Sequence, residues 1–115
     1  MDYKTARNFL IDRGTALLTQ RNPDDFLVRL RSGKAPVPGQ LTSILLALKI
    51  SFDALKEETY LDRDLILALH LLCFESRQLY EVGLKSGIEW PPMLNEDLDR
   101  IAIAVRSIFA GTWQG

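Results

Sequence analysis

The chain contains only one cysteine and one histidine among its 115 residues, and this scarcity excludes several classes of protein. Cys73 cannot form an internal disulfide, which is typical of a reducing compartment. Residues 1–4 also lack the charged and then apolar plan of a secretory signal, so we expect a cytoplasmic protein. A structural zinc ion needs four ligands and a catalytic one three. His70 and Cys73 alone therefore predict no metal site, and we expect no cofactor.

Long apolar runs and an excess of one charge are also missing. Within the most apolar segment, 61–86, the longest uncharged run is Leu65–Phe74 with ten residues, about half of the roughly 20 needed to span a bilayer. The formal net charge is −1, which gives no overall basic footprint for nucleic acid. Four basic residues lie near one another in sequence: Arg21, Arg29, Arg31 and Lys34. The proline loop at 33–39, between the second and third expected helices, is too long for the tight turn of a helix-turn-helix. We expect neither membrane nor nucleic acid as a partner.

Catalytic motifs are absent as well. The Gly33-Lys34 pair is followed by Ala35 where a phosphate-binding loop needs serine or threonine, and no glycine stands at the required place upstream. No Gly-x-Ser-x-Gly nucleophile motif occurs. The carboxylates cluster at the expected helix starts, where capping and the helix dipole account for them. The sequence thus predicts no catalytic residue.

Apolar residues at helical spacing are what the sequence does supply. They predict helices at 3–20 (with a kink at Gly14), 23–31, 40–56, 61–86 and 95–110, and no strand pattern competes with them. Asn22 and Asn95 are expected to cap the helices that follow them. The fold prediction is one all-α domain over residues 1–115, a compact five-helix bundle.

The helix expected at 61–86 is apolar nearly all round and organises the bundle. Leu65, Leu69 and Leu72 share one face, while Leu67 and Phe74 lie on the opposite side. A helix with no polar face must be surrounded by protein or lipid. Because lipid is excluded by the short uncharged run, we expect this helix to be buried at the centre.

One narrow polar stripe interrupts that helix. Arg63, His70, Arg77 and Glu81 follow one another at spacings of seven, seven and four, which places them on one line along the helix. One interpretation is a solvent-facing seam in which Arg77 and Glu81 form an i,i+4 pair. The other is a partly buried polar site between helices, with His70 as its titrating group.

Three apolar residues fall outside the main stripes of their helices: Leu46, Ile50 and Ile103. Leu46 and Ile50 could be isolated surface residues, could pack on the short second helix, or could contact a second molecule. With no chemistry in view, they favour a non-catalytic protein–protein interaction or adaptor module, either binding another protein or associating with itself as a homodimer. The alternative is an enzyme or small-ligand binding protein that uses the polar stripe around His70.

Two tryptophans stand outside the expected helices. Trp90 and Met93, in an apolar proline-containing linker, are expected to plug one end of the bundle, the other reading being a surface patch for a partner. Trp113, in the short segment after Gly111, is expected to dock on the body of the protein.

Three segments carry a resemblance: PVPGQLTSILLALK at 36–49, ESRQLYE at 75–81 and EWPP at 89–92. Through them the chain resembles, over nearly its whole length, a small cyanobacterial family of uncharacterised helical proteins. The segments contain no catalytic signature, so the resemblance implies a helical fold and no site. Some relatives carry a dethiobiotin synthetase label. That activity implies ATP held by a phosphate-binding loop on an α/β fold, and this sequence has neither the loop nor the strands.

Overall fold

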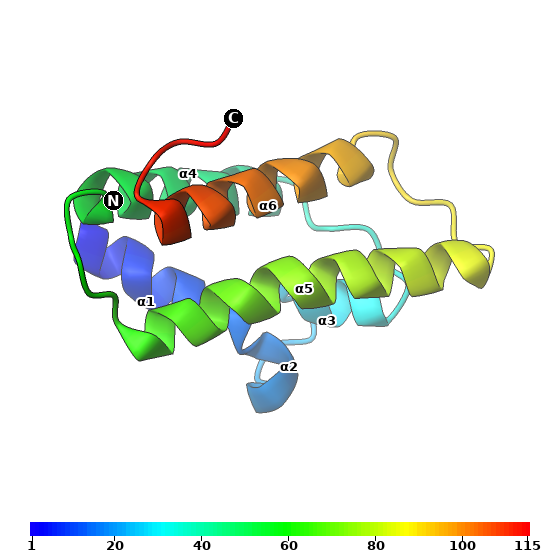
Figure 1. Cartoon of the computed structure of the whole chain (residues 1–115). Helices are drawn as coiled ribbons and strands as arrows, with labels where there is room; N and C mark the ends of the chain where they lie inside the picture. Colours follow the sequence, from blue (N-terminus) through cyan, green and yellow to red (C-terminus); the bar gives the residue numbers. More distant parts are fainter.

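The computed structural model describes all 115 residues as an all-α bundle without strands (Figure 1), which confirms the predicted fold class. It contains six helices where five were expected. They are α1 (Tyr3–Gly14), α2 (Ala16–Thr19), α3 (Phe26–Arg31), α4 (Gln40–Leu55), α5 (Arg63–Lys85) and α6 (Leu94–Ala110).

The helix expected at 3–20 is divided in two, which corrects that prediction. The backbone leaves helical geometry at Thr15, whose hydroxyl donates a 2.7 Å hydrogen bond to the carbonyl oxygen of Ile11. Such a bond competes with the helical pattern. The short α2 then points away from the bundle (Figure 1) and ends at Thr19, and the next residue, Gln20, has a left-handed φ of 50°. The predicted kink at Gly14 is therefore a full break.

Three predicted helix starts are also corrected, and the helix expected at 61–86 extends from Arg63 to Lys85 because the Asp62 side chain caps its first turn. α3 begins at Phe26 and not at Pro23, because the Asn22 side chain accepts the Asp24 backbone N–H at 2.9 Å and forms a turn there. α6 begins at Leu94, before Asn95. The Asn95 side chain does not cap the helix, because it accepts a hydrogen bond from Arg77 of α5. Capping residues in a sequence can instead serve turns or contacts between helices.

Four helices, α1, α4, α5 and α6, make up the bundle, and the short α3 packs on α5 beyond α1. α1 and then α3 pack along α5, α4 lies beside α1, and α6 packs on both α4 and α5. α5 and α6 run in opposite directions and are joined by the loop at one end of the molecule (Figure 1). The apolar residues between these helices form one continuous core. α5, α1, α4 and α6 thus form a ring in which each helix contacts the next, and the contact between α5 and α6 closes it.

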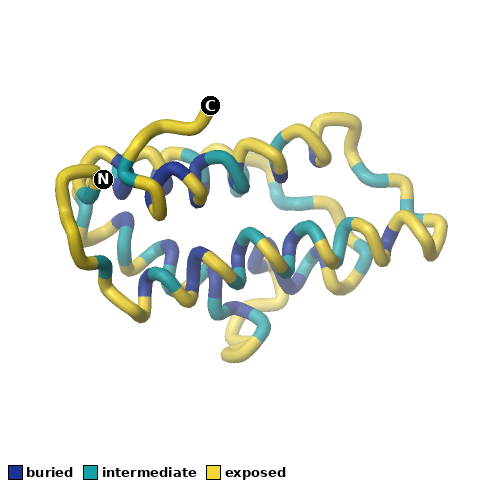
Figure 2. Tube along the Cα trace, in the orientation of Figure 1, coloured by how far each residue is buried: buried dark blue, intermediate teal, exposed yellow.

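Burial of α5 differs from the sequence expectation. Leu65, Leu69 and Leu72 are completely buried, but Leu67 is 51% exposed and Phe74 54%. Dark blue and yellow alternate along this helix in Figure 2. Because α1, α3 and α6 all cover one side of α5, its other side faces water. The expectation that protein surrounds this helix on every side is wrong.

Both tryptophans pack against the body. The Trp90 indole N–H donates to the carbonyl oxygen of Tyr80 at 3.0 Å, and its ring lies against Gly83 of α5. Met93, expected to be buried beside it, is half exposed. Trp113 meets Phe52 of α4 edge-on, with ring centres 5.2 Å apart, which confirms the predicted docking.

Candidate functional site

The largest hollow in the molecule lies between α5 and α6, and we call it the α5–α6 groove. Its volume is about 740 Å³ and its surface is mainly apolar. Binding pockets of comparable size commonly form between the helices of bundles. The groove is lined from α5 by His70, Cys73, Phe74, Arg77, Gln78, Glu81, Val82 and Lys85, and from α6 by Leu98, Ala102, Val105 and Phe109.

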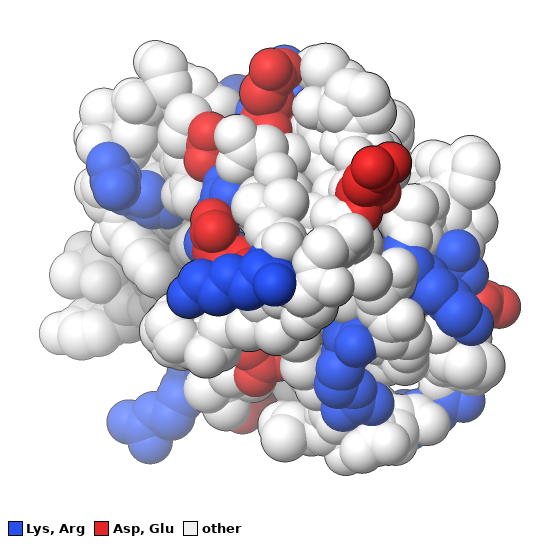
Figure 3. Space-filling model, turned by 90° about the vertical axis from the view of Figure 1, so that its right-hand side faces the viewer, with Lys and Arg blue, Asp and Glu red and all other residues white.

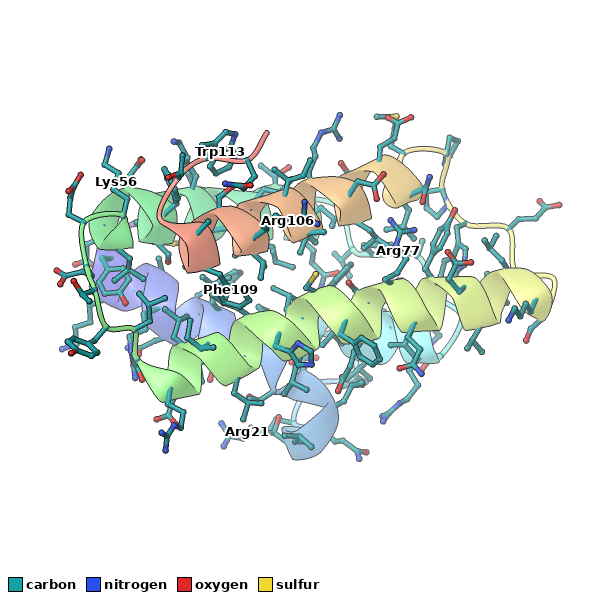
Figure 4. All side chains as sticks on the ribbon, viewed as in Figure 1. Arg21, Lys56, Arg77, Arg106, Phe109 and Trp113 are labelled. Carbon is teal, nitrogen blue, oxygen red and sulfur yellow. The ribbon has the colours of Figure 1, made fainter.

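Half-exposed aromatic side chains stand on both walls. Phe74 belongs to α5, and Phe109, 46% exposed, extends from α6 toward α5 (Figure 4). The His70 ring stacks on Phe74 with ring centres 5.7 Å apart. Between the walls, Leu98 and Val105 are buried and form an apolar floor. The groove thus exposes side chains that would lose unfavourable contact with water if they were covered.

Arg77 joins the two walls (Figure 4). Its guanidinium donates to the Asn95 side chain at 2.6 Å, to the Asn95 carbonyl oxygen at 3.2 Å and to Asp99 at 2.7 Å. It also lies 3.8 Å from Glu81 on its own helix. These bonds occupy Arg77 and tie α5 to the first turns of α6.

The polar stripe predicted from sequence is divided by the structure. His70, Arg77 and Glu81 all line the α5–α6 groove. Arg63 lies at the exposed first turn of α5 and is not one of the lining residues. The expected i,i+4 pair of Arg77 and Glu81 is present. The stripe therefore forms part of the rim of an apolar groove.

Cys73 lies within the groove and is half-buried. Burial raises the pKa of its thiol, and the positive charges of Arg77 and Arg106 partly oppose that rise. The thiolate is the reactive form of cysteine. A raised pKa keeps this thiol protonated near neutral pH, so it contributes polarizable surface to the groove more readily than nucleophilic chemistry.

The three off-stripe residues do not line one common hollow. Leu46 is 50% exposed, whereas Ile50 packs against the core. Ile103 lines a second hollow of about 380 Å³ between α4 and α6, with Trp113 beside it. As a partner surface, this set stays a prediction.

Sequence reasoning missed the principal residues of the groove: Phe74, Val82 and Phe109. Phe74 and Val82 were expected to be buried because α5 is apolar on nearly all sides. A usable signal was present, since a polar stripe marks the water-facing line of a helix. Phe74 lies one turn after His70, and Val82 directly follows Glu81. Apolar residues that border such a line are candidates for exposed positions.

The remaining surface offers no comparable site. No three side chains of His, Cys, Asp or Glu gather closely enough to hold a metal ion. Acidic and basic residues are interspersed on the face in Figure 3. None of the six helices has both the length and the apolar character that crossing a membrane requires.

Comparisons with protein-family models, curated proteins and solved structures return no match. The resemblance to the cyanobacterial helical family stays a prediction. The α5–α6 groove is therefore interpreted from its own geometry and chemistry.

Proposed function

We propose that this chain is a cytoplasmic protein–protein interaction module whose α5–α6 groove receives an amphipathic helix from a partner. The observation that carries the proposal is the open, mainly apolar hollow of about 740 Å³ between two antiparallel helices. Grooves of this kind take the apolar face of a helix, whose anchors recur at i, i+3 or i+4, and i+7.

The dimensions of the groove suit such an occupant. On α5 it runs from His70 to Lys85, which is about 22 Å at 1.5 Å per residue, or roughly four helical turns. A helix laid between α5 and α6 would pack its side chains into their grooves as helices do inside the bundle. Phe74 and Phe109 would then contact it from both sides.

The polar groups of the groove support binding more than bond-breaking chemistry. The guanidinium of Arg77 is engaged by Asn95 and Asp99. The thiol of Cys73 has a raised pKa. Such groups hold walls in place and fix the orientation of a bound chain, which is the usual role of the polar rim around an apolar interface.

A synthetic neutral helix tests the proposal. The peptide has about five turns, leucine and alanine on one face, and glutamine and serine on the other. It is added to ¹⁵N-labelled protein while backbone amide shifts are recorded. We expect the shifts to concentrate on α5 and α6, and Phe74→Glu to weaken binding at least tenfold, about 1.4 kcal/mol or more, because a charge would enter the apolar contact.

Leu46→Glu is the matched control, since Leu46 is 50% exposed and Phe74 54%. The two variants therefore introduce the same charge at sites of similar exposure. Unchanged binding by Leu46→Glu and loss by Phe74→Glu would support the groove. Loss of peptide binding in Leu46→Glu but not in Phe74→Glu would indicate that the peptide binds the surface of Leu46 and Ile50 instead. No binding of the peptide to the wild-type protein would contradict the proposal.

A further inference from the structure

We propose that the helix received by the α5–α6 groove is acidic and carries two carboxylates about 12 residues apart, one paired with Lys85 and the other with Arg106. This inference rests on the proposed function and adds the chemistry of the partner. Its basis is the placement of the cations around the groove that have no partner within the chain.

The charges along the groove are unequally paired. Arg77 is neutralised by Asp99 at 2.7 Å and by Glu81 at 3.8 Å. Lys85 and Arg106 form no ion pair and no side-chain hydrogen bond, and both are exposed. Counting these five groups, three cations face two anions, so the rim has one excess positive charge. An acidic occupant would complete the pairing, whereas a basic one would meet Lys85 and Arg106 as like charges.

Arg106 is not a lining residue of the groove but borders it on the wall opposite Lys85. It follows Ala102 of the groove by one turn of α6, and its charge acts on the thiol of Cys73 across the groove. Figure 4 shows Arg106 on α6, between Phe109 and Arg77 along the length of the bundle. The groove therefore has one unpaired cation on each wall.

The two cations also lie toward opposite ends of the groove. Because α6 runs antiparallel to α5 (Figure 1), Arg106 in the second half of α6 lies far from Lys85 at the end of α5 and toward the level of Cys73, which precedes Lys85 by 12 residues. At 1.5 Å per residue this separation is about 18 Å along the helix axis. A docked helix spans the same distance in about 12 residues, and 12 residues also turn its side chains by about 120°. Carboxylates at i and i+12 would thus reach both ends and both walls.

The test uses four synthetic helices with the same apolar face. One carries glutamates at i and i+12, one carries glutamates at i and i+4, one has glutamines in their place, and one has lysines at i and i+12. Dissociation constants are measured by fluorescence anisotropy at low and at high salt. We expect the first peptide to bind about five- to tenfold more tightly than the neutral one at low salt, with most of the gain lost at high salt.

Charge reversal in the protein identifies the pairing. Lys85→Glu should weaken binding of the i,i+12 acidic peptide about fivefold or more. Replacing one glutamate of that peptide with lysine should restore the affinity toward Lys85→Glu, which a change in fold would not do. Lys56→Glu is the control, since Lys56 is an exposed lysine beyond the end of α4 with no ion pair, away from the groove (Figure 4).

The outcomes separate the two proposals. If the neutral and acidic peptides bind equally and Phe74→Glu abolishes both, the acidic partner is excluded while the helix-binding groove stands. If the i,i+4 peptide gains as much affinity over the neutral peptide as the i,i+12 peptide does, the net charge of the peptide alone raises the affinity. The proposed pairing with Lys85 and Arg106 is then wrong. If no peptide binds in a way that depends on Phe74, both proposals fail.

Discussion

Gly14 of α1 lies directly against the backbone of Ala68 in α5. A Cβ atom built on Gly14 would be 2.7 Å from the carbonyl carbon of Ala68, closer than real side chains approach a backbone. Two helices can come this near only where one of them lacks a side chain. The contact fixes the distance between α1 and α5, and it coincides with the point at which the first helix ends.

Gly14→Ala should therefore destabilise the protein although alanine favours helix. Overpacking against a backbone that cannot move aside costs about 1–3 kcal/mol, while the gain in helix propensity is at most about 1 kcal/mol. Urea unfolding monitored by circular dichroism would show a lower midpoint. Lys4→Ala, an exposed site on the same helix, should change little. Equal stability of Gly14→Ala and the wild type would mean that α1 and α5 can separate freely at this point.

Gly83 and Trp90 form a second close contact, with a different expected result. A Cβ atom on Gly83 would lie 2.8 Å from Cε2 of Trp90, but here the neighbour is a side chain on a linker and can move. Gly83→Ala should cost less stability than Gly14→Ala and should displace the indole. In a Trp113→Phe background, where Trp90 is the only tryptophan, its fluorescence should shift to longer wavelength. An unshifted spectrum would show that the indole keeps its place.

How far the fold could be predicted is clear from the individual helices. The apolar periodicity of α4 and α6 predicts both helices to within one residue of their observed ends, because their buried faces follow a single stripe. The sequence predicted a kink at Gly14 but not a full break at Thr15, nor the contact of Gly14 with Ala68, which is 54 residues away in sequence. Only the α1–α5 packing determines how closely these two segments approach.

The groove was harder to predict than the fold. His70, Arg77 and Glu81 were identified from their spacing, and the structure places all three along the groove. Phe74 and Phe109 were not identified, because periodicity gives the face of a helix on which a residue lies and not the neighbour that covers it. An apolar face buried in the core and one left open for a partner have the same pattern in sequence.

Glu75 should make stability depend on pH. One oxygen of its carboxylate is buried without a hydrogen bond, and burial raises its pKa, which His70 and Arg31 partly oppose. A carboxyl with a raised pKa binds more protons in the folded state, so stability falls as pH increases from the ordinary 4.5 through the folded pKa. Above that range the charged carboxylate lowers the free energy of unfolding by a constant amount.

Glu75→Gln should remove this dependence. We expect the variant to gain stability relative to the wild type as pH rises from 4.5 through the raised pKa of Glu75, with the difference constant at higher pH. Thermal unfolding of both proteins across this range measures the difference. Glu89→Gln, at an exposed glutamate, is the control. A difference between wild type and Glu75→Gln that is the same at all pH values would contradict a raised pKa.

Cys73 provides an internal reporter of the groove. Its thiol is half-buried and has a raised pKa, so little of the reactive thiolate is present at neutral pH. Alkylation by iodoacetamide, followed by mass spectrometry, should be about tenfold or more slower in the folded protein than in urea. The folded rate should also keep increasing at alkaline pH values where the unfolded rate has levelled off.

A helix bound in the groove should slow this reaction further, because Cys73 lies among the residues that the helix would cover. The neutral peptide should therefore protect the thiol in the wild-type protein and in Leu46→Glu but not in Phe74→Glu. This comparison places the peptide without assuming which side chains it contacts. Protection that persists in Phe74→Glu would locate the peptide elsewhere, since the charge at position 74 would then lie outside its contact.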